Sequence, residues 1–215
     1  MKKPPPLDPA RESENPVCER IIAAAFMAFM EHGYAGTSML EIATRAKISK
    51  RDLYANFPGK QAVLLACIAS RAARMRLPAD LPIPRNRRML AATLQTFGAI
   101  VIREVSQPAV MAMFRLAIAE AERSPEVAET LNDSRSVNRG ALAALLEQSQ
   151  AAGILRRGDA GEMMEQFFAL LWGDLLLSRL LCVATPPKPA EIDRRALAAT
   201  EAFLRIYAKP MADAG

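Results

Sequence analysis

The sequence has few of the residues that bind metals or form disulfide networks. Its 215 residues include one histidine and three cysteines, and Cys18, Cys67 and Cys182 lie far apart. They form no paired-ligand spacing of a zinc module and no disulfide framework. The first residues also lack a basic segment followed by an apolar run, the pattern of a secretory signal. We therefore expect no metal site, no cofactor and a cytoplasmic location.

Uninterrupted apolar runs and catalytic motifs are also missing. The longest apolar stretch, residues 167–184, is interrupted by Gly173, Asp174 and Arg179. Because a charge inside a bilayer costs roughly 3 kcal/mol, we interpret the stretch as a buried helix and expect no membrane partner. Glycine-rich phosphate loops, the nucleophile elbow and the two-histidine zinc protease pattern do not occur. No catalytic motif therefore supports an enzyme.

The residues that are abundant predict a folded helical protein. Hydrophobic residues make up 51% of the chain, which is enough for a sizeable core. Alanine and leucine are frequent, apolar residues recur at helical intervals and the alternation typical of strands is absent, so we predict an all-α fold. Helices are expected near residues 16–32, 38–45, 49–56, 60–76, 86–106, 108–122, 125–152, 160–183 and 189–208.

Prolines indicate where the chain divides. Four prolines stand among charged residues in the first fifteen positions, and three more lie within residues 78–84, where they stop any helix. The first fifteen residues are either a flexible lead-in or an arm that touches the minor groove of DNA. The predicted segments are a flexible extension (1–15), a small helical domain (16–62), a connecting helix with a Pro-rich linker (63–84) and a larger helical domain (85–215).

Positive charge is concentrated in the N-terminal part. Residues 1–88 carry 15 basic and 8 acidic side chains, a net charge of +7, whereas residues 89–215 carry 13 and 15, a net charge of −2. Such a distribution suits a polyanion such as DNA. The alternative is a basic face that is merely solvated.

Two capping patterns within residues 38–52 predict a helix-turn-helix. Ser38 with Glu41 and Ser49 with Asp52 each fit a capping box, and the two serines are eleven residues apart. Two short helices joined by a tight turn follow from this spacing. The residues expected to face inward are Ile22, Phe26, Phe29, Ile42, Ala43, Ile48, Leu53 and Phe57.

The outer face of the second short helix has the chemistry to bind DNA. With Leu53 turned inward, the helical period exposes Lys50, Arg51 and Tyr54. Arginine can donate two parallel hydrogen bonds to guanine O6 and N7, and lysine can contact a base or a phosphate. We therefore predict that residues 16–62 are a domain that binds double-stranded DNA in the major groove.

The same stretch resembles the TetR/AcrR family of bacterial transcriptional regulators. The resemblance lies in residues 33–37 (GYAGT), the pair Ile42-Ala43, residues 46–49 (AKIS) and residues 53–60 (LYANFPGK). Lys47 stands where the family usually has glycine, and Asn56 where it often has histidine. The resemblance implies phosphate contacts from Thr37, Tyr54 and Lys60 and base contacts near Lys50 and Arg51. The full set of candidate DNA-binding residues is Thr37, Lys47, Ser49, Lys50, Arg51, Tyr54, Asn56 and Lys60.

The C-terminal part is predicted to form a dimer. Apolar side chains of the expected helix 160–183 cover nearly every direction around its axis, so it needs burial on two sides. We expect one side to pack within its own subunit and the other on a partner subunit. The final helix, 189–208, is expected to add Leu197, Phe203, Leu204 and Tyr207 to that interface. From Phe114 onward the chain also resembles AefR-type C-terminal domains of the same family.

Family members of this kind sense small molecules in the larger domain. The candidate lining suits an apolar or amphipathic effector, although the same residues would serve as ordinary bundle core. Asp174 would then orient a cationic ligand or pair with an arginine across the dimer. The candidate ligand-binding residues are Met111, Met113, Phe114, Phe167, Leu171, Trp172 and Asp174.

These observations predict a cytoplasmic, homodimeric and ligand-responsive transcriptional regulator. It would act as a repressor and bind a palindromic operator. Two alternatives stay open at this point. One is an architectural DNA-binding protein without a sensor function, and the other is an α-helical enzyme that uses Asp174 or Glu147.

Overall fold

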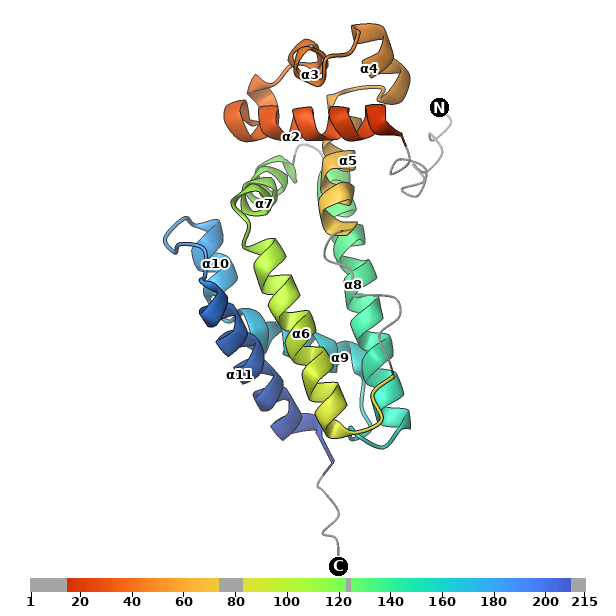
Figure 1. Cartoon of the computed structure of the whole chain (residues 1–215), viewed down its shortest axis with the longest axis vertical. Coiled ribbons are helices and arrows are strands. Elements are labelled where there is room, and N and C mark those ends of the chain that lie inside the picture. The colour runs from red at the N-terminus through yellow and green to blue at the C-terminus, as the bar shows by residue number, and fades with distance from the viewer. Residues whose placement is uncertain (1–14, 74–82, 123–124, 210–215) are drawn as a thin grey trace, which may run out of the picture. The chain divides into compact units, whose positions relative to one another are not determined.

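The computed structural model describes residues 15–73, 83–122 and 125–209, and most of these residues lie in helices (Figure 1). They form helices α2 to α11 and no strand, apart from an isolated antiparallel bridge between Leu155 and Ala208. The predicted all-α fold is confirmed. The predicted extension 1–15 lies almost wholly outside the described residues, as do most of the prolines of the predicted linker.

The helix bounds agree closely with the pattern of caps and breakers. Five helices begin at a residue whose side chain accepts a hydrogen bond from a backbone N–H of the first turn. These N-cap residues are Asn15, Ser38, Ser49, Asn86 and Asp159. The helices are α2 (Pro16–Gly36), α3 (Met39–Ala46), α4 (Lys50–Asn56), α5 (Lys60–Ala73), α6 (Arg87–Val105), α7 (Pro108–Glu120), α8 (Pro125–Ala151), α9 (Ala160–Trp172), α10 (Leu175–Leu180) and α11 (Pro189–Tyr207).

The prediction of a single helix over residues 160–183 was wrong, because α9 ends at Trp172 and a separate helix, α10, begins at Leu175. Gly173 takes φ +46, a left-handed conformation that glycine adopts without strain, and its N–H donates to the Ala169 carbonyl at 2.9 Å. Asp174 follows in the break, where it is exposed and its carboxylate accepts a hydrogen bond from Ser178 Oγ. It is therefore not the buried carboxylate that the predicted helix implied.

The described residues form two compact units. The first consists of those within 1–73 and 112–134, and the second of those within 74–111 and 135–215. The domain boundaries predicted from the sequence stay a prediction. No single helix in the described ranges is long and apolar enough to cross a membrane; α6 and α7 together reach that composition but bend by 72°.

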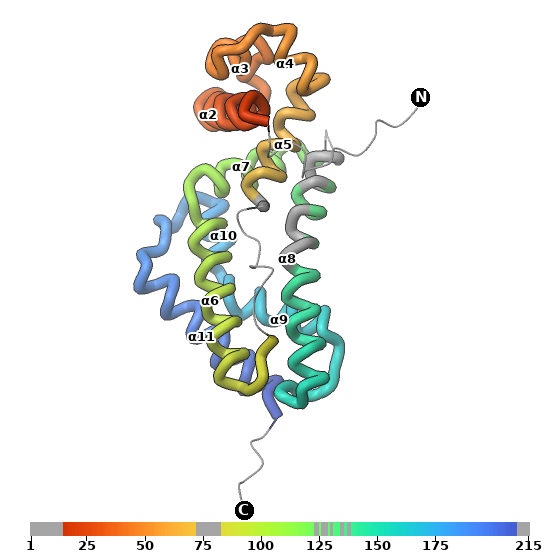
Figure 2. Tube along the Cα trace, turned by 45° about the vertical axis from the view of Figure 1, so that its right-hand side comes forward, coloured from red at the N-terminus to blue at the C-terminus, as the bar shows by residue number. Residues whose placement is uncertain are grey.

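The first unit is organised around α2, against which α3 and α5 pack (Figure 2). As predicted, Phe26 and Phe29 of α2 are buried, but Ile21 lies in the core instead of Ile22, which is only half-buried. Ile48 is also half-buried. The prediction of buried residues is confirmed for Ile42 and Ala43 in α3, for Leu53 in α4 and for Phe57 directly after α4. Each large one contributes roughly 1.5–3 kcal/mol by leaving water.

The second unit is held by aromatic packing among α6, α9 and α11. The Phe167 ring lies 5.6 Å from that of Phe203 and 6.5 Å from that of Phe97, measured between centroids. Phe203, Leu204 and Tyr207 are thus buried in their own subunit, so their predicted place on a dimer interface was wrong. Of the four α11 residues assigned to that interface, only Leu197 is exposed.

Candidate nucleic-acid interface

Two side-chain caps and one left-handed residue build the helix-turn-helix. Ser38 Oγ accepts from the Glu41 N–H at 3.1 Å, and Ser49 Oγ accepts from the Asp52 N–H at 3.0 Å. Between the helices Lys47 takes φ 54 and ψ 50 and caps α3 with its own N–H. Lys47 therefore adopts the conformation for which the family usually uses glycine, and a non-glycine residue holds it at a cost of about 1 kcal/mol.

The outward face of α4 carries cations and an aromatic ring. Leu53 anchors the opposite face and is fully buried, whereas Lys50 and Arg51 are exposed and Tyr54 is 46% exposed. The Lys50 ammonium lies 5.9 Å from the centroid of the Tyr54 ring, within cation–π range. Asp52, the acidic residue of α4, bonds to Ser49 Oγ at 2.7 Å instead of pairing with these cations. The face is thus positively charged and has hydrogen-bond donors to offer.

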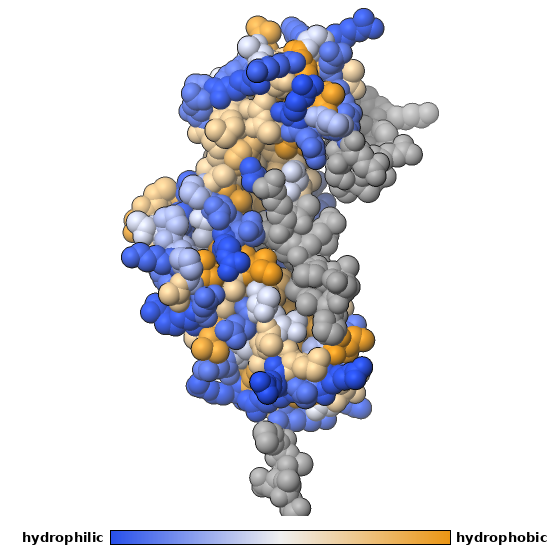
Figure 3. All heavy atoms as spheres, viewed as in Figure 1, coloured by the Kyte–Doolittle hydropathy of each residue, from blue (hydrophilic) through white to orange (hydrophobic). Residues whose placement is uncertain are grey.

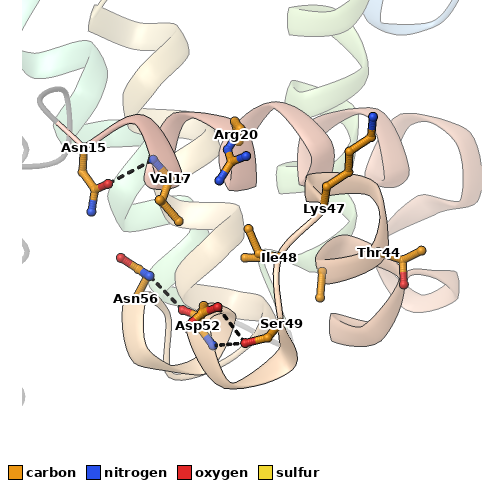
Figure 4. A pocket seen from close by; sticks show the side chains of 10 residues that line it. Asn15, Val17, Arg20, Thr44, Lys47, Ile48, Ser49, Asp52 and Asn56 are labelled. Carbon is orange, nitrogen blue, oxygen red and sulfur yellow. Dashed lines mark hydrogen bonds between the residues drawn. The ribbon is translucent and has the colours of Figure 1, made fainter.

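A groove of about 610 Å³ lies between α2, α3 and α4, on the side of α4 that carries Asp52 and Asn56 (Figure 4). Its lining mixes cations with Asp52 and small polar groups. Asn56 Nδ2 donates to the Asp52 carbonyl at 2.8 Å, and Cys18 Sγ donates to Asn56 Oδ1 at 3.3 Å. The residues that line the groove are Asn15, Val17, Arg20, Ala43, Thr44, Lys47, Ile48, Ser49, Asp52 and Asn56.

Two of the expected phosphate contacts are engaged inside the protein. Lys60 Nζ donates to the carbonyls of Tyr34 at 2.6 Å and Thr37 at 2.9 Å, and lies 4.5 Å from the Tyr34 ring centroid. Thr37 is only 2% exposed, and its hydroxyl donates to the Gly33 carbonyl at 2.8 Å. Both side chains thus satisfy backbone carbonyls at the end of α2. Their contact with phosphate stays a prediction.

An ion cluster that sequence reasoning missed fastens α3 to α2. Arg45 contacts Glu31 at 2.5 Å and Glu41 at 3.2 Å, and His32 Nε2 lies 3.2 Å from the Glu41 carboxylate. The hydrogen bond from Arg45 lowers the pKa of Glu31, and its positive charge acts in the same direction. The i,i+4 spacing of Glu41 and Arg45 was a signal for one of these pairs. The contribution of α2 depends on the tertiary structure.

Comparison with known families identifies the chain. Residues 92–209 match the C-terminal domain of AefR-like transcriptional repressors, and residues 21–67 match the tetR family of bacterial regulatory proteins. The chain belongs to the TetR family. Both resemblances predicted from the sequence are confirmed, and the protein is a DNA-binding transcriptional regulator instead of the α-helical enzyme left open above.

Individual regulatory proteins are similar to this chain over most of its length. An HTH-type transcriptional regulator of Mycobacterium tuberculosis is 25% identical over 181 residues, which cover 82% of this chain and 81% of the relative. The structure of a TetR-family regulator from Mesorhizobium loti is 26% identical with a TM-score of 0.77 and covers 94% of this chain and all of that one. The flavonoid-responsive regulator FrrA is 29% identical with a TM-score of 0.72 and the same coverage.

The candidate effector residues of this TetR-family chain are divided between the two units. Met113 and Phe114 belong to the first unit, and the other five belong to the second. Phe167 and Leu171 pack against α6, since a Cβ on Gly98 would lie 2.9 Å from Leu171 Cδ1. Met111 and Met113 are buried, Phe114 and Trp172 are half-buried and Asp174 is exposed. Effector binding by this set stays a prediction.

Proposed function

We propose that this TetR-family protein is a homodimeric repressor that binds a palindromic operator and releases it when a small molecule binds. The observation that carries the proposal is the exposed, positively charged face of α4, held in place by a capped and packed helix-turn-helix. Lys50, Arg51 and Tyr54 share that face. A short helix with such a face fits the major groove of double-stranded DNA.

Each residue of the face is given a role by its chemistry. Arg51 can donate two hydrogen bonds to guanine, which makes it the principal base reader. Lys50 reaches a base or a neighbouring phosphate, and the Tyr54 hydroxyl and the Lys47 ammonium reach the backbone. Thr37, Ser49, Asn56 and Lys60 complete the expected set. Ser49 caps α4 and Asn56 joins it to Cys18, whereas Thr37 and Lys60 hold the end of α2.

Dimerisation is proposed through the region around α10. Leu177, Leu181 and Val183 are exposed there, Leu181 by 64%, and Leu197 is exposed on α11. Apolar side chains gathered in this way are typical of an interface with a second copy, as expected for residues 160–183 and 189–208. A two-fold axis would then present two α4 helices to the two half-sites of an operator.

An apolar or amphipathic effector is proposed to bind among the C-terminal helices. The similar protein FrrA is described as flavonoid-responsive, and such planar, partly polar molecules fit a lining rich in methionine and aromatic rings. The effector shifts the equilibrium only if it binds the DNA-releasing state more tightly than the DNA-bound state. The repressor role follows the AefR-like C-terminal domain.

The DNA-binding proposal is tested by selecting bound sequences from random duplexes and titrating the result by fluorescence anisotropy. A palindromic consensus is expected. Changing Arg51 to Ala should cost about 1–3 kcal/mol of binding free energy and relax the preference at one position in each half-site. Arg194→Ala, at an exposed arginine of α11, is the matched control. Equal affinity for the palindrome and for scrambled DNA would instead support an architectural protein.

The dimer is tested by placing charge in the apolar surface. The double variant Leu177→Glu/Leu181→Glu should sediment as a monomer while its helical circular dichroism stays unchanged. Met27→Glu changes an equally exposed apolar residue of α2, outside the predicted interface, and should leave the dimer intact. A double variant that still sediments as a dimer would contradict the proposed interface.

A further inference from the structure

One large apolar side chain of the helix-turn-helix is left in water. Leu40, in the first turn of α3, is 62% exposed, whereas Ile42 on the same helix and Leu53 on α4 are fully buried. Figure 3 shows one face of the molecule, on which apolar patches lie among hydrophilic residues. The folding of this unit does not account for Leu40, since the core is complete without it.

The position of Leu40 on α3 is defined by its neighbour one helical turn further on. Thr44 is four residues away, so the two side chains follow one flank of the helix, and Lys47 follows α3 directly as its left-handed cap. Thr44 and Lys47 line the groove together with Ser49 and Asp52 (Figure 4), which shows that this flank is the one beside α4. Leu40 lies one turn before Thr44 on the same flank of α3.

The other exposed flank of α3 carries its acid. Glu41 and Arg45 lie there, and both are joined to His32 and Glu31 at the end of α2. The flank of Leu40 and Thr44 thus presents no carboxylate of α3 to an approaching phosphate backbone. Its first turn is also fixed, because Ser38 caps the helix and Thr44 Oγ1 donates to the Leu40 carbonyl at 2.9 Å.

We propose that Leu40 reads the 5-methyl group of a thymine in the operator half-site contacted by α4. The inference rests on the proposed DNA-binding function and adds a position of sequence preference to it. A leucine side chain neither donates nor accepts a hydrogen bond, so it gains nothing from a phosphate. The one apolar group that base pairs present in the major groove is the thymine methyl group. A fixed, exposed leucine beside the reading helix matches that chemistry.

The test removes the methyl group without changing any hydrogen bond. Each thymine of the selected operator is replaced in turn by deoxyuridine, in both half-sites at once, and the dissociation constant is measured for the unaltered protein and for Leu40→Ala. The unaltered protein should lose about fourfold in affinity per half-site at one position, the value of one buried methyl group. Leu40→Ala should bind thymine and deoxyuridine operators equally there, with an affinity close to that of the unaltered protein on deoxyuridine.

Met27→Ala is the matched control, since it removes a similarly exposed apolar side chain from α2 and should keep the deoxyuridine penalty. A penalty that is unchanged in Leu40→Ala overturns the inference. An equal loss of affinity of Leu40→Ala for the thymine and deoxyuridine operators also overturns it. Full affinity of Leu40→Ala for both operators overturns it too, and is the result expected if Leu40 contacts a protein partner. Failure of the proposed function itself is distinct: Arg51→Ala would then bind the operator as well as the unaltered protein.

Discussion

The helix-turn-helix and the C-terminal helices differ in the side chains that they leave exposed. On α4 they include Lys50, Arg51 and Tyr54, whereas around α10 several are apolar, among them Leu177 and Leu181. A charged, hydrogen-bonding face suits a polyanion that stays hydrated, and an apolar face suits a surface that excludes water. The comparison supports the proposals that the first region binds DNA and that the other contacts a second copy of the chain.

The two regions also differ in how they are held. The helix-turn-helix combines a small apolar core with directed hydrogen bonds, among them the cap of Ser49 and the contacts of Lys60 to the end of α2. The C-terminal helices depend on the cluster of Phe97, Phe167 and Phe203. Substitutions in the aromatic cluster should therefore be more costly to folding than substitutions of single caps.

The largest effect is expected from Phe203→Ala. This side chain is fully buried, and its ring centroid lies 4.9 Å from that of Tyr207. Its removal should lower the free energy of unfolding by about 4 kcal/mol through lost contacts and a residual cavity. Urea denaturation at fixed protein concentration measures this, with exposed Ile206→Ala as control. A loss of less than about 1 kcal/mol would show that the cluster does not hold the region.

Ser49→Ala should lower the free energy of unfolding several times less than Phe203→Ala. It removes the N-cap of α4, and such caps contribute about 1 kcal/mol. Asp52 also loses the hydroxyl that donates to its carboxylate. Ser49→Thr keeps the cap and should behave like the unaltered chain in the same urea titration. A loss as large as that of Phe203→Ala would abolish the distinction between the two regions.

Lys47→Gly should separate folding from DNA binding, because its effects have opposite signs. Glycine adopts the left-handed conformation of this turn freely, so the free energy of unfolding should rise by about 1 kcal/mol. Loss of the cation should make the slope of log affinity against log salt concentration less negative by about 0.9 for each phosphate contact that is lost. Lys47→Asn also tolerates the conformation but lacks the charge. An unchanged salt slope in both variants would remove Lys47 from the interface.

The smallest expected difference is the rate at which two cysteine thiols react, which does not involve the stability of the fold. Burial raises the pKa of the Cys67 thiol to about 12, whereas Cys182 is exposed. Iodoacetamide at pH 8.5 should therefore alkylate Cys182 first and leave Cys67 protonated and unmodified. Mass spectrometry of the intact protein and its peptides gives the order. Early modification of Cys67 would show that its helix opens readily.

Local signals in the sequence explain how much of the helix-turn-helix could be predicted. The caps at Ser38 and Ser49 define where α3 and α4 begin, and the helical period places Lys50 and Arg51 opposite Leu53. These signals act within four residues, so no distant part of the chain is needed to interpret them. The same holds for most helix bounds, which caps and prolines define.

Other features depend on contacts between distant segments and could not be predicted. The period of the apolar residues continued through Gly173, and only the packed structure shows that the chain turns there and leaves Asp174 in water. The family resemblance implied a phosphate contact for Lys60, but no short-range pattern showed where its ammonium lies within the protein. Its ammonium donates to carbonyls 23 to 26 residues earlier in the chain, at the end of α2.

The sequence by itself determined the helical class, the helix-turn-helix and the cationic face of α4, because each follows from short-range periodicity and capping. Tertiary structure decided which side of each apolar helix is buried. Phe203 and Tyr207 lie in the subunit core and Leu181 is exposed, although all three are apolar residues in predicted helices. Periodicity specifies which residues share a face, whereas the neighbours that cover that face come from elsewhere in the chain.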